Sequence, residues 1–193
     1  MWFCVAVALL SRRLRRLCDV ESFQRRGGQT FTANTADPES LRLNPATGNL
    51  LWPNEGQRSA AGLHNPSVRE MTAAGAHLRD LSVPARFIPA GSAAGTAAGG
   101  SGIRNNLAFE SLTLSTDGRT LYTATENALV RDGAAASTVQ ASPSRFPSFA
   151  LASGNAGAGY LYNVAPVVLP PKPAGGLATN AAAAGCYLRS PPT

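Results

Sequence analysis

The chain has 193 residues, a formal net charge of +6, and only 15% charged and 7% aromatic residues. Typical domains contain about 25% charged residues, so this composition, with 19 Gly and 14 Pro, excludes a coiled coil and a disulfide-stapled miniprotein. It also excludes a multi-span membrane protein. The length suits one domain or part of a larger one.

The positive charge is concentrated at the N-terminus. Residues 1–26 hold six arginines against Asp19 and Glu21, and so carry +4 of the +6. The remaining sequence has no basic stripe interleaved with aromatic residues, and we therefore expect no nucleic-acid partner. The three cysteines are far apart and lack the spacing of a zinc site.

An apolar run at residues 2–10 precedes an arginine cluster. A secretory signal has the opposite order, and a bilayer span needs about 20 apolar residues. The sequence therefore predicts no clear signal peptide and no transmembrane helix. A poor signal, a basic amphipathic helix, a buried strand or helix, and sequence from a misplaced start all remain open for this segment.

Two hairpins are predicted further along. Residues 39–45 alternate polar and apolar side chains, a turn follows at 45–48, and residues 50–52 supply the second strand. Residues 110–116 repeat the pattern, and Asp117-Gly118 separates them from the β-branched and aromatic run at 119–125. An Asp-Gly pair between alternating runs is a good short-range hairpin signal.

These two hairpins are similar in sequence. Each reads Glu-Ser-Leu-x-Leu, a turn with Gly, a strand and a second Glu, so Glu39 and Glu55 correspond to Glu110 and Glu126 at a separation of 71 residues. A propeller blade takes about 40–45 residues, and the Gly/Ala/Ser tract at 91–102 accounts for part of the excess as a flexible surface insertion. Repeated strand hairpins favour a β-propeller.

Further strands are predicted at 145–151 and 159–169, and the sequence after Pro170 is poor in packing residues. We therefore expect an all-β domain of partial β-propeller-like blades at 31–170. A poorly defined basic segment at 1–30 and a low-complexity tail at 171–193 are predicted to be flexible or disordered. The domain has room for two or three blades, whereas a closed propeller needs at least four, so we expect a truncated propeller.

The run GIRNNLAFESLTLSTDGRTLYTATENALVRDG at 102–133 resembles the phytase-like family, whose members are described as having esterase-like activity of phytase. The matching residues are Arg104, Asn106, Phe109, Glu110, Leu112, Asp117, Gly118, Glu126, Asp132 and Gly133. The segment at 37–56 resembles the family's Asp-Pro-Glu segment, although Ser40 and Ser111 replace glycines that often follow the motif glutamates. The resemblance implies a truncated propeller, phosphoric-ester or esterase-type hydrolysis, and secretion or periplasmic export.

Five of the eleven acidic residues lie at the ends of the two hairpins. Glutamates that begin inner strands can converge on a propeller channel, where carboxylate oxygens bind a hard cation such as Ca²⁺. A metal held there polarises a phosphoryl oxygen and activates water, so the partner we expect is a small-molecule phosphate ester. The predicted metal ligands are Asp37, Glu39, Glu55 and Glu110. The predicted catalytic residues are Glu110, Glu126 and Arg104, and the predicted substrate ligands are Arg104, Asn105 and Asn106, since a guanidinium matches phosphate.

Other functions stay open. The glutamates equally suit hydrogen bonds to backbone N–H groups of a neighbouring blade, in a non-catalytic binding module or an inactive fragment, and Arg104 suits a plain salt bridge. A serine triad is disfavoured because GxSxG is missing. His64 and His77 lie in loop-like sequence, and we expect them to be exposed. Neither the substrate, the metal nor the oligomeric state follows from the sequence.

Overall fold

The computed structural model describes residues 23–32, 35–95, 99–170, 172, 174 and 181–182. In this part of the chain the protein is all-β, as predicted, apart from the short 3₁₀ helix η3 (Ala85–Phe87). None of the helical structure described there has the length and hydrophobicity that a membrane crossing requires. The predictions for residues 1–22, and for most of 171–193, lie outside the described residues.

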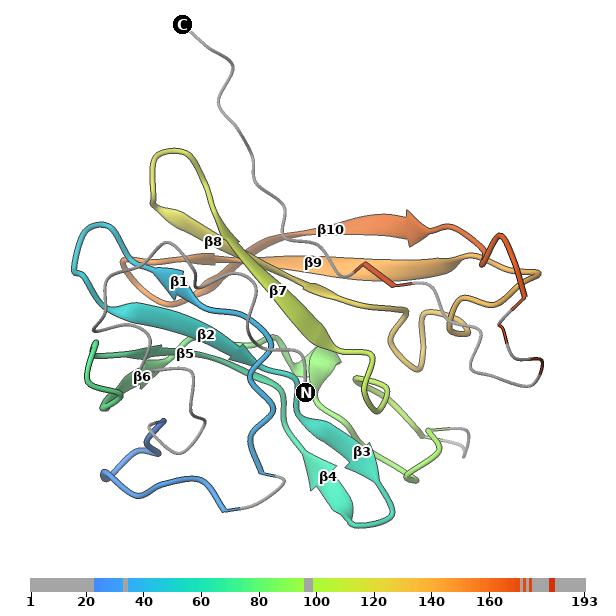
Figure 1. Cartoon of the computed structure of the whole chain (residues 1–193), viewed down its shortest axis with the longest axis horizontal. Helices are drawn as coiled ribbons and strands as arrows, with labels where there is room; N and C mark the ends of the chain where they lie inside the picture. Colours follow the sequence, from blue (N-terminus) through green and yellow to red (C-terminus); the bar gives the residue numbers. More distant parts are fainter. Residues whose placement is uncertain are drawn as a thin grey trace, which may run out of the picture.

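The first four-stranded sheet is antiparallel and has the order β1-β2-β5-β6 (Figure 1). Its strands are β1 (Arg42–Leu43), β2 (Leu50–Asn54), β5 (Ser67–Met71) and β6 (His77–Asp80). A separate hairpin of β3 (Gln57–Ser59) and β4 (Gly62–His64) is inserted between β2 and β5. The predicted hairpin at 39–52 is confirmed by the pairing of β1 with β2.

The second sheet is an antiparallel meander with the order β10-β9-β8-β7. Its strands are β7 (Phe109–Leu114), β8 (Thr120–Thr125), β9 (Ser142–Ala150) and β10 (Ala156–Val164). They confirm the hairpin around Asp117-Gly118 and the two strands predicted after it. Both sheets therefore have the four-stranded antiparallel form of a propeller blade.

The first hairpins of the two sheets share one register. Leu43 pairs with Leu50 in the first sheet, and Leu114 pairs with Leu121 in the second, 71 residues further along. The same offset relates the bridge between Pro38 and Asn54 to the pair that begins the second hairpin. Corresponding residues of the two hairpins therefore occupy corresponding places in the two sheets.

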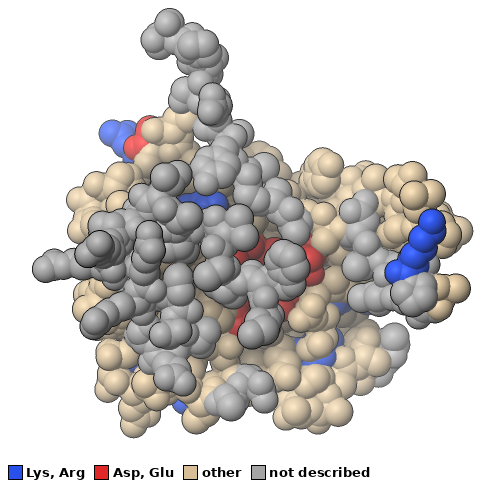
Figure 2. All heavy atoms as spheres, in the orientation of Figure 1, with Lys and Arg blue, Asp and Glu red and all other residues tan. Residues whose placement is uncertain are grey.

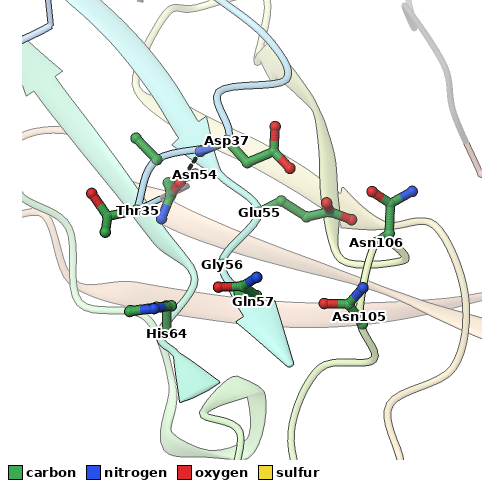
Figure 3. A pocket seen from close by; sticks show the side chains of 10 residues that line it. Thr35, Asp37, Asn54, Glu55, Gly56, Gln57, His64, Asn105 and Asn106 are labelled. Carbon is green, nitrogen blue, oxygen red and sulfur yellow. Dashed lines mark hydrogen bonds between the residues drawn. The ribbon is translucent and has the colours of Figure 1, made fainter. Parts of the chain in front are cut away.

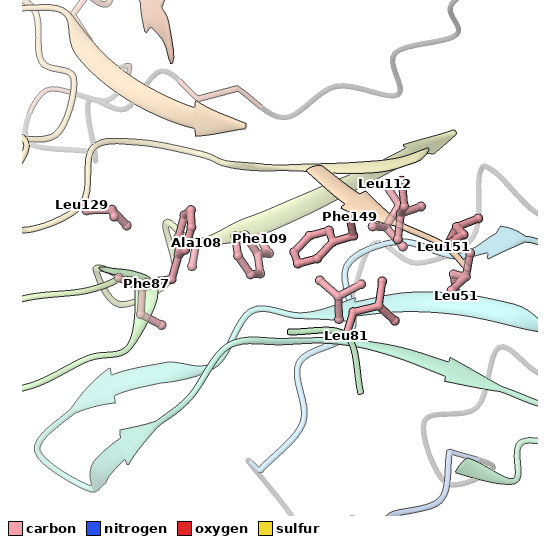
Figure 4. Packing of buried hydrophobic residues seen from close by; sticks show 12 residues of the cluster. Leu51, Leu81, Phe87, Ala108, Phe109, Leu112, Leu129, Phe149 and Leu151 are labelled. Carbon is pink, nitrogen blue, oxygen red and sulfur yellow. The ribbon is translucent and has the colours of Figure 1, made fainter. Parts of the chain in front are cut away.

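The main hydrophobic core lies between the two sheets (Figure 4). Leu51 from β2 and Leu121 from β8 are fully buried there, and the rings of Phe87 and Phe109 lie 5.1 Å apart. Burying one such side chain contributes about 1.5–3 kcal/mol. The core holds the two sheets face to face, and this brings the ends of β2 and β7 together.

A second cluster covers the other face of the first sheet. Phe23 packs edge-on against Trp52 at 4.8 Å, with Leu50 and Met71 beside them. Phe31 also contacts Trp52 edge-on, at 5.8 Å. Both faces of β2 are therefore covered, and all five of its residues are buried.

The expectation that both histidines are exposed and lie in loops is wrong. His77 lies in β6 with a side chain only 7% exposed, 3.8 Å from Asp80. His64 lies in β4 and is half-buried. Both strands are too short to be recognised from an alternation of polar and apolar residues. They form because β6 pairs with β5 and β4 pairs with β3.

The Gly/Ala/Ser tract is not simply a surface insertion. Its ends pair through a bridge between Ala90 and Ser101. The buried Arg58 guanidinium donates to the backbone carbonyls of four residues there, Ala90, Ser92, Ser101 and Ile103. Backbone carbonyls close to a glycine-rich turn supply the acceptors that this buried cation requires.

Candidate functional site

The five acidic residues at the hairpin ends lie where the two sheets meet. Glu55 directly follows the last residue of β2, and Glu126 directly follows the last residue of β8. Their backbone N–H groups donate to equivalent carbonyls, those of Asp37 at 2.9 Å and Ala108 at 2.8 Å. The shared register thus places the two glutamates at corresponding strand ends.

Glu110 occupies an irregular position in β7. Phe109 pairs with Thr125 and Ser111 pairs with Ala124, so Glu110 is the extra residue of a β-bulge. Bulges redirect side chains and are frequent beside functional sites. The bulge here allows the Glu110 side chain to join the acidic groups instead of following the regular alternation of the strand.

The five carboxylates form two overlapping groups that share Glu55. One group is Asp37, Glu39 and Glu55, and the other is Glu55, Glu110 and Glu126. Within each group, one oxygen per residue lies within 4.8 Å of the others. Figure 2 shows acidic side chains gathered near the centre of one face of the molecule. We call these five residues the carboxylate cluster.

Burial raises the pKa values of the four glutamates in the cluster. For Glu39 and Glu55 the value rises to about 8, and the nearby negative charges of Glu110 and Asp37 add to the effect of burial. For Glu110 and Glu126 the pKa rises to about 7, again because of burial first and neighbouring carboxylates second. In the cluster, burial and the mutual repulsion of the carboxylates therefore outweigh the interactions that stabilise their negative charge.

Glu70 shows how this protein compensates a buried carboxylate elsewhere. It is as buried as Glu55, yet its pKa is lowered, because hydrogen bonds outweigh the effect of burial. Asn49 donates to Oε1 at 3.0 Å and Arg79 donates to Oε2 at 2.7 Å. Asn44 and Thr47 add two longer hydrogen bonds. A glutamate with a purely structural role is thus bound by several side-chain donors in this protein.

A polar cavity of about 220 Å³ opens beside the cluster (Figure 3). Its lining contains Asp37 and Glu55 together with the side chains of Gln57, Asn105 and Asn106. The ten described residues that line it are Thr35, Ala36, Asp37, Asn54, Glu55, Gly56, Gln57, His64, Asn105 and Asn106. None of these is Arg or Lys, so an anionic group would enter this cavity only with a cation.

Asn105 and Asn106, which the sequence predicts to be substrate ligands, both line the cavity. The Oδ1 atom of Asn105 accepts the Arg58 backbone N–H at 3.0 Å, which orients this amide. Asn106 has a positive φ of 53°, the one such non-glycine residue in the described part of the chain. Sequence reasoning missed Gln57 and His64, whose isolated positions carry no motif.

Arg104 is placed differently from Asn105 and Asn106, the other predicted substrate ligands. Its Nε donates to the Ala128 carbonyl at 3.0 Å, and its Nη2 donates to the Gly133 carbonyl. It is not among the cavity-lining residues. The guanidinium therefore binds the loop that follows β8, and Glu126 is the first residue of this loop.

Glu55 also links the two sheets. Its Oε1 accepts the backbone N–H of Ala108, just before β7, at 2.8 Å, and this bond opposes the rise of its pKa. The side chain is only 2% exposed. This contact is the blade-locking hydrogen bond considered above as the structural alternative, and Glu55 is the cluster member for which it is observed.

The donor set of the cluster fits a calcium ion. Ca²⁺ takes oxygen ligands at 2.3–2.6 Å, so ligands on opposite sides of one ion lie about 4.8 Å apart. The oxygens in each group lie within that limit, and a dication would offset the repulsion that raises the glutamate pKa values.

Comparison with known families identifies the chain. The model of the phytase-like family, described as esterase-like activity of phytase, matches residues 13–185. The chain belongs to the phytase-like family. No curated protein and no solved structure matches it. The family match spans both sheets and the whole carboxylate cluster.

Proposed function

We propose that this phytase-like protein hydrolyses phosphate or related esters with a divalent cation, Ca²⁺ being the first candidate, held by the carboxylate cluster. The observation that carries the proposal is the convergence of five carboxylates from two sheets beside one polar cavity without a basic lining residue. When bound there, such a cation polarises a phosphoryl oxygen and lowers the pKa of a coordinated water.

The residues of the chain divide into three roles. Asp37, Glu39, Glu55 and Glu110 hold the cation through carboxylate oxygens. Glu126 accepts a proton from the attacking water; without a cation, burial raises the pKa of its carboxyl group to about 7, toward the range in which a general base works near neutral pH. Asn105 and Asn106 donate amide N–H groups to substrate oxygens in the cavity.

Arg104 enters this proposal as a positioning residue. Its two hydrogen bonds hold the Ala128 and Gly133 carbonyls, and so fix the loop after Glu126. Loss of these two hydrogen bonds should displace the Glu126 carboxylate without removing it. An Arg104→Lys variant cannot reproduce the planar fork, so its activity should fall while cation affinity stays close to that of the wild type.

The test measures cation binding and turnover separately. Calorimetric titration with Ca²⁺ reports the site, and release of p-nitrophenol from p-nitrophenyl phosphate and p-nitrophenyl acetate reports the reaction. We expect Glu110→Gln to weaken Ca²⁺ binding and Glu126→Gln to lower turnover by about 10²-fold or more. Asp117→Asn, in an exposed turn, is the matched control. Turnover indifferent to chelator and to Glu126→Gln would contradict the proposal.

A non-catalytic binding module is the second candidate, favoured by the hydrogen bond between Glu55 and Ala108. In that case the glutamates stabilise the packing of the sheets. Glu110→Gln and Glu126→Gln would then change the free energy of unfolding but reveal no turnover to lose. Calcium binding without hydrolysis of either ester would support this candidate.

A further inference from the structure

His64 is a titratable side chain on the wall of the polar cavity, and it has no role in the hydrolysis described so far. It lies in β4, lines the cavity and is half-buried. Within the described part of the chain its imidazole makes no hydrogen bond or ion pair, whereas His77 lies 3.8 Å from Asp80. His64 also belongs to neither group of the carboxylate cluster. The imidazole is therefore free to act on a ligand in the cavity.

The hairpin of β3 and β4 turns one of its faces to the cavity. Gln57 pairs directly with His64, so the two side chains project from the same face of the hairpin, and both line the cavity. Arg58 follows Gln57 and projects from the opposite face, where its buried guanidinium donates to backbone carbonyls of the 90–103 loop. This anchor on the far face keeps His64 on the cavity side.

Gly56 holds the backbone of His64 close to the carboxylate cluster. It directly follows Glu55 and has a φ of +80°, and a Cβ at this position would lie 2.7 Å from the His64 carbonyl oxygen. Only glycine allows both this conformation and this close approach at little cost. The end of β4 is thus packed against the backbone one residue beyond a cluster glutamate. A rigid backbone contact therefore sets where the imidazole lies relative to the cluster.

The direction of phosphoryl transfer brings the leaving oxygen to the side of the cavity where His64 lies. The attacking and leaving oxygens stand on opposite sides of the phosphorus atom. Glu126, which takes the proton of the attacking water, directly follows β8 of the second sheet. The leaving oxygen then points toward the first sheet and its β3–β4 hairpin. Figure 3 shows His64 on one side of the cavity and the proposed substrate ligands Asn105 and Asn106 on the other.

Among the ten described residues that line the cavity, His64 is the one suited to give this oxygen a proton. The lining contains two carboxyl groups, those of Asp37 and Glu55, and both are assigned to the cation. The other polar side chains of the lining are amides and one threonine hydroxyl, which do not release protons near neutral pH. Histidine is the side chain that most often transfers protons in this pH range.

We propose that His64 is the general acid that protonates the leaving oxygen of a phosphate ester, a role that rests on the hydrolytic function proposed for the carboxylate cluster. The water oxygen forms a bond to phosphorus while one water proton passes to the Glu126 carboxylate. The bond between phosphorus and the ester oxygen breaks, its electron pair stays on that oxygen, and the oxygen takes a proton from the His64 imidazolium. Hydrogen phosphate and an alcohol result. Solvent then removes the proton from Glu126 and returns one to His64.

The test compares an alkyl ester with an aryl ester. An alkoxide is a strong base and needs a proton as it departs, whereas p-nitrophenolate is a weak base and leaves without one. His64→Gln keeps a polar side chain but has no proton to transfer. In millimolar Ca²⁺ this variant should lower kcat/KM for glycerol 2-phosphate by about 10²-fold or more, and kcat/KM for p-nitrophenyl phosphate by less than about threefold. The Ca²⁺ affinity from calorimetric titration should stay close to that of the wild type. If this variant lacks the circular dichroism spectrum of the wild type, His64→Asn provides the same comparison.

Leu63→Gln is the matched control, since Leu63 precedes His64 in β4, is 38% exposed and points to the opposite face of the hairpin. It should leave the ratio of the two kcat/KM values unchanged. Equal loss on both esters in His64→Gln, or no loss on either, would overturn the role of His64 while the proposed hydrolysis stands. Weaker Ca²⁺ binding in this variant would make His64 a cation ligand and would also overturn it. A wild type that hydrolyses neither ester would overturn both proposals.

Discussion

Replacing Glu55 by Gln and by Ala separates the charge of this side chain from its hydrogen bond. Its Oε1 accepts the Ala108 backbone N–H at 2.8 Å in a buried position. Gln keeps an acceptor oxygen with the same reach and removes the charge, whereas Ala removes both. In chelator we therefore expect Glu55→Gln to be at least as stable as the wild type and Glu55→Ala to be less stable than Glu55→Gln.

The structure gives the size of these two effects. A buried N–H left without its acceptor costs about 1–3 kcal/mol, and truncating a buried side chain adds a cavity cost of about 1 kcal/mol. Glu55→Ala should thus be about 2–4 kcal/mol less stable than Glu55→Gln, or roughly 5–15 °C lower in Tm for a chain of this length. The pKa of about 8 for Glu55 implies that Glu55→Gln gains up to a few kcal/mol at pH 8.

Urea unfolding at pH 7.5, in chelator and in millimolar Ca²⁺, measures both effects. Calcium at 100 times its Kd should stabilise the wild type by about 2.7 kcal/mol, and both variants should lose most of this increment. Equal destabilisation of Gln and Ala variants in chelator would refute the argument that buried charge opposes folding here. A full calcium increment in Glu55→Gln would refute the role of Glu55 as a ligand.

Three further predictions concern stability. In chelator the free energy of unfolding should fall as the pH rises from about 5 to 8, because the cluster glutamates, with folded pKa values of about 7 to 8, bind more protons folded than unfolded. Urea titrations with and without Ca²⁺ should show that the stabilisation by calcium grows over this pH range. A free energy of unfolding that rises with pH in chelator would contradict the prediction. Arg58→Lys should cost about 3 kcal/mol in the same assay, because an ammonium cannot replace the guanidinium fork that binds the carbonyls of the 90–103 loop; a loss below about 1 kcal/mol would argue against it. Gly102→Ala places a Cβ 2.2 Å from the Ile88 carbonyl oxygen at a φ of +83° and should prevent a cooperative thermal transition, whereas Gly48→Ala, at a φ of +72° in open space, should cost only about 1–2 kcal/mol.

Local sequence was sufficient to predict the hairpins. Asp117-Gly118 between alternating runs specifies where the chain reverses, and Ser115 and Arg119 then hydrogen-bond to the Asp117 carboxylate. The strands β3 to β6 escaped prediction because they are short and carry charged residues such as Arg58 and Glu70. Their burial depends on partners distant in sequence, which no local pattern encodes.

The site divides in the same way. The sequence by itself determined that the acidic residues recur at matching ends of two similar hairpins, since that correspondence is written in residue order and spacing. Only the tertiary structure decided that the carboxylates converge, that a bulge redirects Glu110, and that Arg104 binds backbone carbonyls instead of lining the cavity. It also decided that Glu55 and Glu70, equally buried, have pKa values shifted in opposite directions. The reason is that distances between charges and the supply of hydrogen-bond donors arise from how two sheets pack, and packing joins residues that the sequence keeps tens of positions apart.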